Sequence, residues 1–165
     1  MRASAAVVLL ALAAAGCASA SNTTPETAGT IDATGALQYD GQFRPVQQSD
    51  GRVGMSTVQR IYGDVRILFR ESTDRSRVTL SLNTNNQQSE VLAWAVVPGR
   101  CGSGGVPLLP AAQFPPLEIT NTGRGEVAGR ELPLSMPSAS YHVNVYRGGE
   151  TLSNVIACAN LQLRR

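Results

Sequence analysis

The sequence predicts an all-β protein, built as a single antiparallel β-sandwich or barrel. Three observations favour this class. Hydrophobic residues alternate with polar ones along several short stretches, turn-forming residues separate those stretches, and no window of a dozen residues has the spacing of an amphipathic helix. About seven or eight strands at this spacing, without intervening helices, are typical of antiparallel sandwiches and barrels.

The clearest strands are four stretches with one apolar face and one polar face. Their alternating apolar residues are Val65, Ile67 and Phe69; Val78, Leu80 and Leu82; Leu117 and Ile119; and Tyr141, Val143 and Val145. This period of two predicts half-buried strands with one face in water. The predicted turns separate them, at residues 72–74, 83–89, 102–105, 123–125 and 148–149.

A further stretch, residues 91–97 (VLAWAVV), is apolar on both faces, which predicts a central and well-buried strand. It holds the only Trp, Trp94, which we expect in the core rather than in a ligand-stacking role. Residues 106–116 (VPLLPAAQFPP) cannot pair regularly, because each Pro lacks a backbone donor. We expect this stretch to be an irregular loop packed over one end of the sandwich.

Length and composition fit one lightly charged folded domain, which we place at residues 36–165. The chain has 165 residues, of which 42% are hydrophobic and 16% charged. Its 14 basic residues are all Arg, its net charge is only +2, and it has no basic run beyond Arg164 and Arg165. Nucleic-acid binding is therefore not expected, because that function needs a basic surface.

The N-terminal segment has the pattern of a secretory leader. Residues 1–16 combine a basic start at Arg2, an apolar stretch too short to span a bilayer, and small residues before Cys17. Residues 14–17 (AAGC) resemble the lipobox of bacterial lipoproteins, although the family commonly has Leu where this chain has Ala14. The resemblance implies that the leader is removed and that Cys17 is lipidated, which would attach the protein to a membrane. An ordinary secretory signal is the alternative.

The segment after Cys17 is predicted to be a tether. Residues 17–35 are small, polar and nearly free of large apolar side chains, which is the composition of a flexible linker. The expected location is therefore extracytoplasmic, with the domain lipid-anchored to the bacterial cell envelope and facing the periplasm or the cell surface.

If Cys17 carries lipid, Cys101 and Cys158 remain as an even pair in an oxidising compartment. A disulfide is then expected, and two buried free thiols are the alternative. The bridge would join residues 57 positions apart, which the chain-entropy treatment makes worth about 4 kcal/mol.

Two segments around these cysteines resemble Cu/Zn superoxide dismutases and the related CHRD-type domains. They are residues 93–102 (AWAVVPGRCG) and 141–161, which ends in VIACANL. Gly99, Gly102 and the pair Ala157 and Cys158 match the family pattern, and the resemblance covers residues 50–163 in outline. It implies an immunoglobulin-like Greek-key sandwich with the family's intrasubunit disulfide between Cys101 and Cys158.

The metal ligands of that family do not match. Ala95 and Val97 stand where the resemblance implies a His-x-His pair, Tyr146 stands at a later His ligand, and Val155 stands at the active-site Arg. His142 is the only His, and one imidazole cannot build a copper or zinc site. Strand alternation places it with Asn144 and Tyr146, and we expect a sheet-surface histidine.

No other pattern indicates catalysis. His142 is not accompanied by a nucleophile motif. The carboxylates of Glu126 and Glu131 are expected to be solvated on a hairpin. Residues 102–105 (GSGG) fit a simple turn better than an anion-binding loop. No catalytic, cofactor-binding or metal-binding residue is therefore predicted.

The sequence favours a non-catalytic, membrane-anchored lipoprotein whose dismutase-like domain is a binding or structural module of the cell envelope. Two alternatives stay open: a superoxide dismutase with a divergent copper site, and a copper-handling protein. The sequence identifies no protein or envelope partner beyond the membrane itself.

Overall fold

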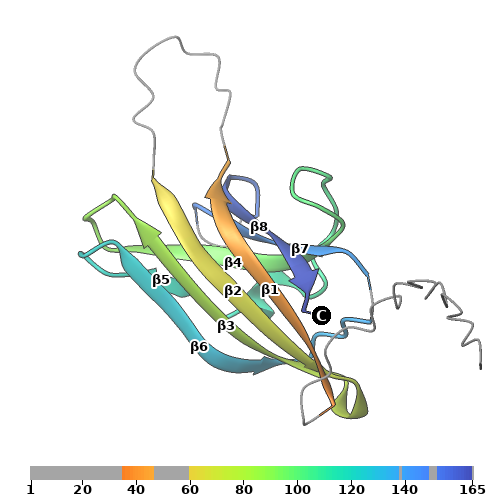
Figure 1. The fold of residues 1–165 in the computed structure, drawn as a ribbon. Helices are drawn as coiled ribbons and strands as arrows, with labels where there is room; N and C mark the ends of the chain where they lie inside the picture. Colours follow the sequence, from red (N-terminus) through yellow and green to blue (C-terminus); the bar gives the residue numbers. More distant parts are fainter. Residues whose placement is uncertain (1–34, 47–59, 138, 149–151, 165) are drawn as a thin grey trace, which may run out of the picture.

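The structure is a computed structural model that describes residues 35–46, 60–137, 139–148 and 152–164. Within these residues, eight antiparallel strands close into one barrel, with two short 3-10 helices in the connections (Figure 1). The strands are β1 (Ala36–Pro45), β2 (Ile61–Arg70), β3 (Arg75–Thr84), β4 (Glu90–Pro98), β5 (Leu117–Ile119), β6 (Arg124–Leu132), β7 (Tyr141–Tyr146) and β8 (Val155–Leu163). The helices are η1 (Glu71–Thr73) and η2 (Ala111–Gln113).

The predicted leader, Cys17 and nearly all of the predicted tether lie outside the described residues. Among the residues that are described, no helix is both long enough and apolar enough to cross a membrane.

The strand order confirms the predicted fold class. Around the barrel the order is β1-β2-β3-β6-β5-β4-β7-β8, and β8 pairs with β1 to close it. Strands β4, β5 and β6 are successive neighbours and β3 lies beside β6, so these four strands form a Greek key. Strand β7 lies beside β4 and completes a second one. The protein is therefore an all-β antiparallel barrel of Greek-key type.

The alternation along β2 and β3 builds one side of the core. The two strands pair over their whole length, from Ile61 opposite Thr84 to Arg70 opposite Arg75. All six predicted inward residues are buried: Val65, Ile67, Phe69, Val78, Leu80 and Leu82. Burying such a side chain stabilises the fold by roughly 1.5–3 kcal/mol relative to leaving it exposed, so this pair of strands is a major source of stability.

Strand β4 is central and largely buried, as its sequence predicts. Leu92 and the residues from Trp94 to Val97 are buried, and Ala93 is partly buried. The predicted burial was wrong for Val91, which is 58% exposed. Val91 lies opposite Glu118 of the short strand β5, and alternation with the buried Leu92 turns its side chain to the outer face of the barrel.

The Pro-rich segment packs along β4. The indole Nε1 of Trp94 donates to the carbonyl of Pro115 at 2.7 Å, and its ring meets that of Phe114 edge-on, with centroids 4.9 Å apart. The backbone N–H of Leu108 donates to the carbonyl of Val96 at 2.9 Å. These contacts confirm the core position of Trp94 and hold the segment between β4 and β5 against the barrel.

The prediction that His142 lies on the sheet surface was wrong. Strand alternation places its side chain on the outer face of β7, together with Asn144 and Tyr146, but His142 is only 1% exposed. The β4–β5 connection covers this outer face. Alternation identifies the face on which a side chain lies, whereas it cannot show whether a distant segment packs over that face.

Candidate functional site

The outer face of β4 and β7 is the region that the dismutase resemblance would make a metal site. Ala95 lies opposite Asn144, and Val97 lies opposite His142. Residues opposite each other on antiparallel strands share one face of the sheet, so these four side chains form one patch. Ala95 and Val97 are fully buried, which gives the patch an apolar centre.

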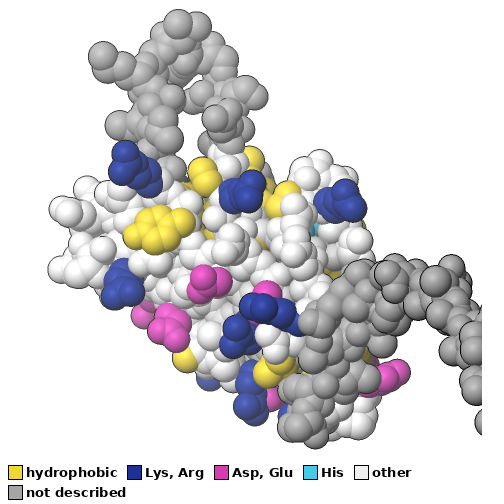
Figure 2. Space-filling model, viewed as in Figure 1, with side chains coloured by type: hydrophobic (Ala, Val, Ile, Leu, Met, Phe, Trp, Pro, Cys, Tyr) yellow, Lys and Arg dark blue, Asp and Glu magenta, His cyan; other side chains and the backbone are white. Residues whose placement is uncertain are grey.

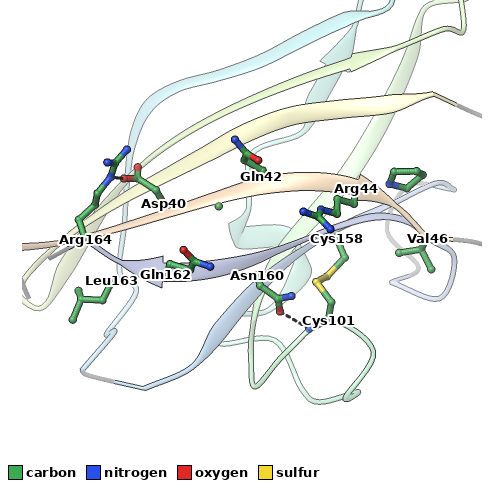
Figure 3. A pocket seen from close by; sticks show the side chains of 12 residues that line it. Asp40, Gln42, Arg44, Val46, Cys101, Cys158, Asn160, Gln162, Leu163 and Arg164 are labelled. Carbon is green, nitrogen blue, oxygen red and sulfur yellow. Dashed lines mark hydrogen bonds and ion pairs between the residues drawn. A yellow bond between two sulfur atoms is a disulfide. The ribbon is translucent and has the colours of Figure 1, made fainter.

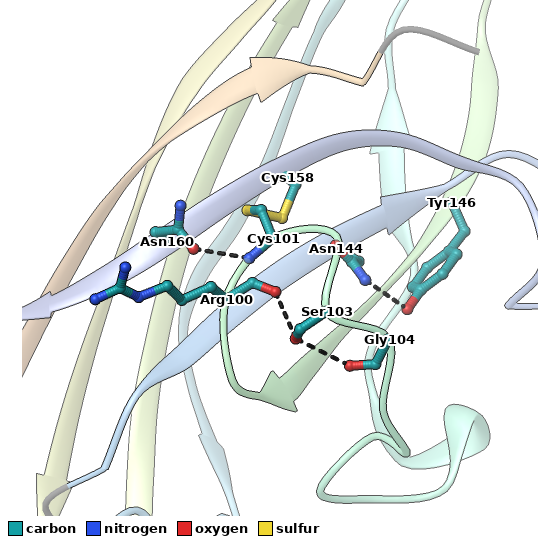
Figure 4. Close-up of a disulfide and its surroundings, with 8 residues drawn as sticks. All are labelled: Arg100, Cys101, Ser103, Gly104, Asn144, Tyr146, Cys158 and Asn160. Atoms are coloured by element: carbon teal, nitrogen blue, oxygen red, sulfur yellow. Dashed lines mark hydrogen bonds between the residues drawn. A yellow bond between two sulfur atoms is a disulfide. The ribbon is translucent and has the colours of Figure 1, made fainter. Parts of the chain in front are cut away.

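A disulfide fixes the covering segment over this face (Figure 4). Cys101 in the β4–β5 connection bonds to Cys158 of β8, with Cα atoms 5.9 Å apart, which confirms the predicted bridge. The backbone N–H of Cys101 also donates to Oδ1 of Asn160 at 2.8 Å. Gly105 lies directly on Val97, because a Cβ added at Gly105 would be 3.0 Å from a methyl of Val97. The segment therefore leaves little room for a ligand over β4.

His142 lies beneath this segment as a neutral imidazole. Burial lowers the pKa of His142, and a hydrogen bond to the backbone of Gly99 opposes that shift only in part. Its Nδ1 is buried and has no hydrogen-bond partner among the described residues. Burying a polar atom without a partner costs free energy, so the buried Nδ1 of His142 lowers the stability of the fold.

The residues of this face do not fit a copper or zinc ion. Ala95 and Val97 offer only aliphatic groups, and the hydroxyl of Tyr146 already accepts a hydrogen bond from Nδ2 of Asn144 at 3.2 Å. The described part of the chain contains no group of three or more His, Cys, Asp or Glu side chains placed to hold a metal. A divalent metal site needs several such donors, so we derive no chemistry from a metal here.

A second feature is a groove of about 900 Å³ on the outer surface where β1 and β8 meet (Figure 3). Residues from β1, β8 and the disulfide loop line it: Asp40, Gly41, Gln42, Arg44, Pro45, Val46, Cys101, Cys158, Asn160, Gln162, Leu163 and Arg164. Half of these residues have polar or charged side chains, and all of those except Asp40 are exposed, whereas the face under the disulfide loop has an apolar centre and is covered. The groove is therefore the more accessible candidate site.

One end of the groove is held by an ion-pair network around Asp40. Its carboxylate accepts hydrogen bonds from Arg164, from Arg66 at 3.0 Å and from Gln38 at 2.9 Å. Partial burial alone would raise the pKa of Asp40, but the hydrogen bonds from Arg164, Gln38 and Arg66 outweigh it and hold that pKa below its usual range. Asp40 is thus ionised, and two guanidiniums share its single negative charge, so this end of the groove has a small net positive charge. Figure 2 shows basic and acidic side chains side by side over β1 and β2.

The floor of the groove is an interruption in the β1–β8 ladder. Asp40 pairs with Gln162, and Arg44 pairs with Cys158, but the residues between these rungs are not paired strand to strand. Gly41 permits a close crossing here, because a Cβ on it would lie 2.9 Å from the carbonyl oxygen of Asn160. The two strands therefore lie close together beneath the middle of the groove, where the side chains of Gln42, Asn160 and Gln162 line it.

The other predicted residues lie apart from the groove. Glu126 and Glu131 are both on β6, where Glu131 pairs with Arg77 at 2.7 Å, and both are exposed as expected. Residues 102–105 form an exposed turn in which Oγ of Ser103 donates to the carbonyl of Arg100. Cys17 lies outside the described residues.

The groove was not predicted from the sequence. Its signal is visible in the sequence as polar residues at every second position of β1 and β8: Asp40, Gln42 and Arg44, then Asn160, Gln162 and Arg164. That pattern also fits any solvent-facing strand. Only the pairing of β1 with β8 brings the two rows together.

Fold and site together define a disulfide-bonded, all-β Greek-key barrel with a polar groove across its closing seam. In comparisons with known proteins, no family model matches the chain, and no curated protein matches it.

Proposed function

We propose that this protein is a non-catalytic binding module of the bacterial cell envelope, lipid-anchored to a membrane through Cys17. The groove between β1 and β8 is the observation that carries the proposal. It is open, it combines polar and apolar side chains, and it lies on two paired strands of a closed barrel, as binding sites built on regular elements do.

The covered face of β4 and β7 supports a non-catalytic role. Ala95, Val97 and Tyr146 occupy the positions at which the dismutase resemblance would place ligands, and apolar side chains there stabilise the fold without a metal. The disulfide between Cys101 and Cys158 is consistent with an oxidising, extracytoplasmic location.

Binding through the groove can be tested by NMR on the full chain carrying Cys17→Ala, which keeps it in solution. The probe is a soluble digest of purified bacterial cell wall. We expect amide shifts to be confined to the groove and to be lost in the double variant Gln42→Ala/Gln162→Ala. The matched control is Gln113→Ala, an exposed glutamine on η2 outside the groove. Shifts that persist in the double variant, or a digest that shifts nothing, would contradict the proposal.

The non-catalytic part has a separate test. Melting curves with copper, zinc or EDTA should coincide, because a ligand shifts the melting temperature only when it binds the folded state more tightly than the unfolded state. A superoxide-decay assay should show no activity above the background of free copper. A metal-dependent rise in melting temperature together with superoxide decay would instead support the divergent dismutase, and a rise alone would support copper handling.

A further inference from the structure

We infer that the groove between β1 and β8 binds a short extended peptide whose terminal carboxylate lies at the disulfide end. This inference rests on the proposed binding function and specifies the class of ligand. Its three supports are the length of the groove, its free side-chain amides and the distribution of unpaired guanidinium groups along it.

The length of the groove fits about four residues of extended chain. The outward-facing residues of β1 run from Asp40 to Arg44, which is four steps along a strand. At about 3.4 Å per residue this distance is roughly 14 Å, the length of an extended tetrapeptide. Val46 and Leu163 line the groove near its two ends and offer small apolar contacts to ligand side chains.

The middle of the groove presents side-chain amides that still have groups free to form hydrogen bonds, as far as the described part of the chain shows. Gln42 and Gln162 are exposed, and neither side chain bonds to another described residue. Asn160 uses only its Oδ1, which accepts from Cys101, so its Nδ2 can still donate. Each side-chain amide both donates and accepts, as does each peptide unit of an extended ligand. The spacing of side chains along one face of a strand matches the two-residue repeat of such a ligand.

Charge sets the direction of the peptide. At the disulfide end, Arg44 lines the groove and Arg100 precedes the lining residue Cys101, and neither guanidinium pairs with a carboxylate among the described residues. At the opposite end, Arg164 and Arg66 are both engaged by Asp40. At the Asp40 end two guanidiniums share one carboxylate, whereas the guanidiniums without a carboxylate partner among the described residues, Arg44 and Arg100, lie at the disulfide end. Arginine pairs with carboxylates through two parallel hydrogen bonds, so a terminal carboxylate fits this end.

The lining favours a peptide over an acidic glycan. No aromatic side chain lines the groove, and the described residues provide no stacking surface there for a sugar ring. The side-chain amides of Gln42, Asn160 and Gln162 instead supply donors and acceptors for the peptide units of an extended chain.

The test compares two probes on the full chain carrying Cys17→Ala, followed by NMR: acetyl-tetra-alanine with a free carboxylate and the same peptide as its carboxamide. We expect the acid to shift the resonances of Gln42, Asn160 and Gln162, and to bind about tenfold more tightly than the amide. In Arg44→Gln the acid should lose this advantage over the amide. The two peptides and the two proteins form a double-mutant cycle, which isolates the interaction between the carboxylate and the guanidinium. The matched control, Arg130→Gln on the exposed part of β6, should keep it.

Several results would overturn the inference. Equal binding of acid and amide, or an unchanged advantage in Arg44→Gln, would exclude the carboxylate assignment. Oligogalacturonate, an acidic glycan, should shift nothing in the groove, and tighter binding of this probe would exclude the peptide. If the cell-wall digest shifts the groove while both peptides up to about 10 mM do not, the binding function stands and the peptide inference is wrong. If neither the digest nor the peptides shift the groove resonances, the proposed binding function and the peptide inference are both wrong.

Discussion

Removing the disulfide with Cys101→Ala/Cys158→Ala should destabilise the barrel by about 4 kcal/mol. The two cysteines are separated by 57 residues, a segment that contains β5, β6 and β7. In the chain-entropy treatment, a crosslink of this span lowers the entropy of the unfolded chain by about 14 cal/mol/K, or about 4 kcal/mol at room temperature. A loss of this size is a large fraction of the stability of an ordinary domain.

The assay is equilibrium unfolding in urea of the oxidised protein, the reduced protein and the double variant. Because the effect lies in the unfolded state, the reduced protein and the double variant should unfold at the same, lower urea concentration. Their native structure should be retained. The backbone hydrogen bonds from Gly99 to Ser140 and from Leu108 to Val96 still hold the covering segment, so the N–H of Leu108 should exchange slowly in both forms.

Two results would refute this reasoning. A loss below about 1 kcal/mol would show that the unfolded chain is already compact enough to make the crosslink redundant. Rapid exchange at Leu108 in the double variant, with stability otherwise unchanged, would show that the bridge acts on the native segment and not on the unfolded chain. A reducing agent should have no effect on the double variant, which provides the control.

Three further predictions follow from the sequence and the site. Cys17→Ala should move the protein from the membrane to the soluble fraction, and unchanged fractionation would refute lipid anchoring. The folded pKa of His142 is below its ordinary value of 6.5, so the neutral form is favoured in the native state and stability should fall as pH drops below about 6.5. His142→Gln should flatten this slope in urea unfolding between pH 5 and 8, and an unchanged slope would assign it to other groups. Trp94→Phe removes the hydrogen bond to the partly buried carbonyl of Pro115, so it should cost about 0.5–1.5 kcal/mol in the same assay, whereas a cost near zero would show that water replaces the indole as donor.

Local patterning predicted much of the barrel. The period of two along β2 and β3 identified the inward residues correctly, because both strands have one face on the core and one face in water. The apolar stretch around Trp94 identified the central strand. The cysteine count, combined with the expected lipidation of Cys17, identified the bridge between Cys101 and Cys158. In each case the decisive information lies within a few residues or in a count.

The features that could not be predicted depend on contacts between distant segments. His142 is buried because the β4–β5 connection packs over β7, some 40 residues later in the sequence. The groove exists because β1 pairs with β8, and because Gly41 permits the two strands to approach closely beneath it. Neither contact can be recognised from nearby residues in the sequence. A strand has the same alternation of polar residues whether its polar face is open to solvent or lines a groove.

The pairing of β1 with β8 also determines when the fold can be completed. These strands are the first and last of the described chain, and the backbone N–H of Arg164 donates to the carbonyl of Gln38 at 2.8 Å. During synthesis or export, β1 must therefore wait until β8 has emerged before the seam can form. Contacts between residues so distant in sequence form slowly, and an unpaired β1 would meanwhile expose an edge that can aggregate. A truncation that removes β8 should thus leave a chain with two open edges, vulnerable to proteases and chaperone-dependent.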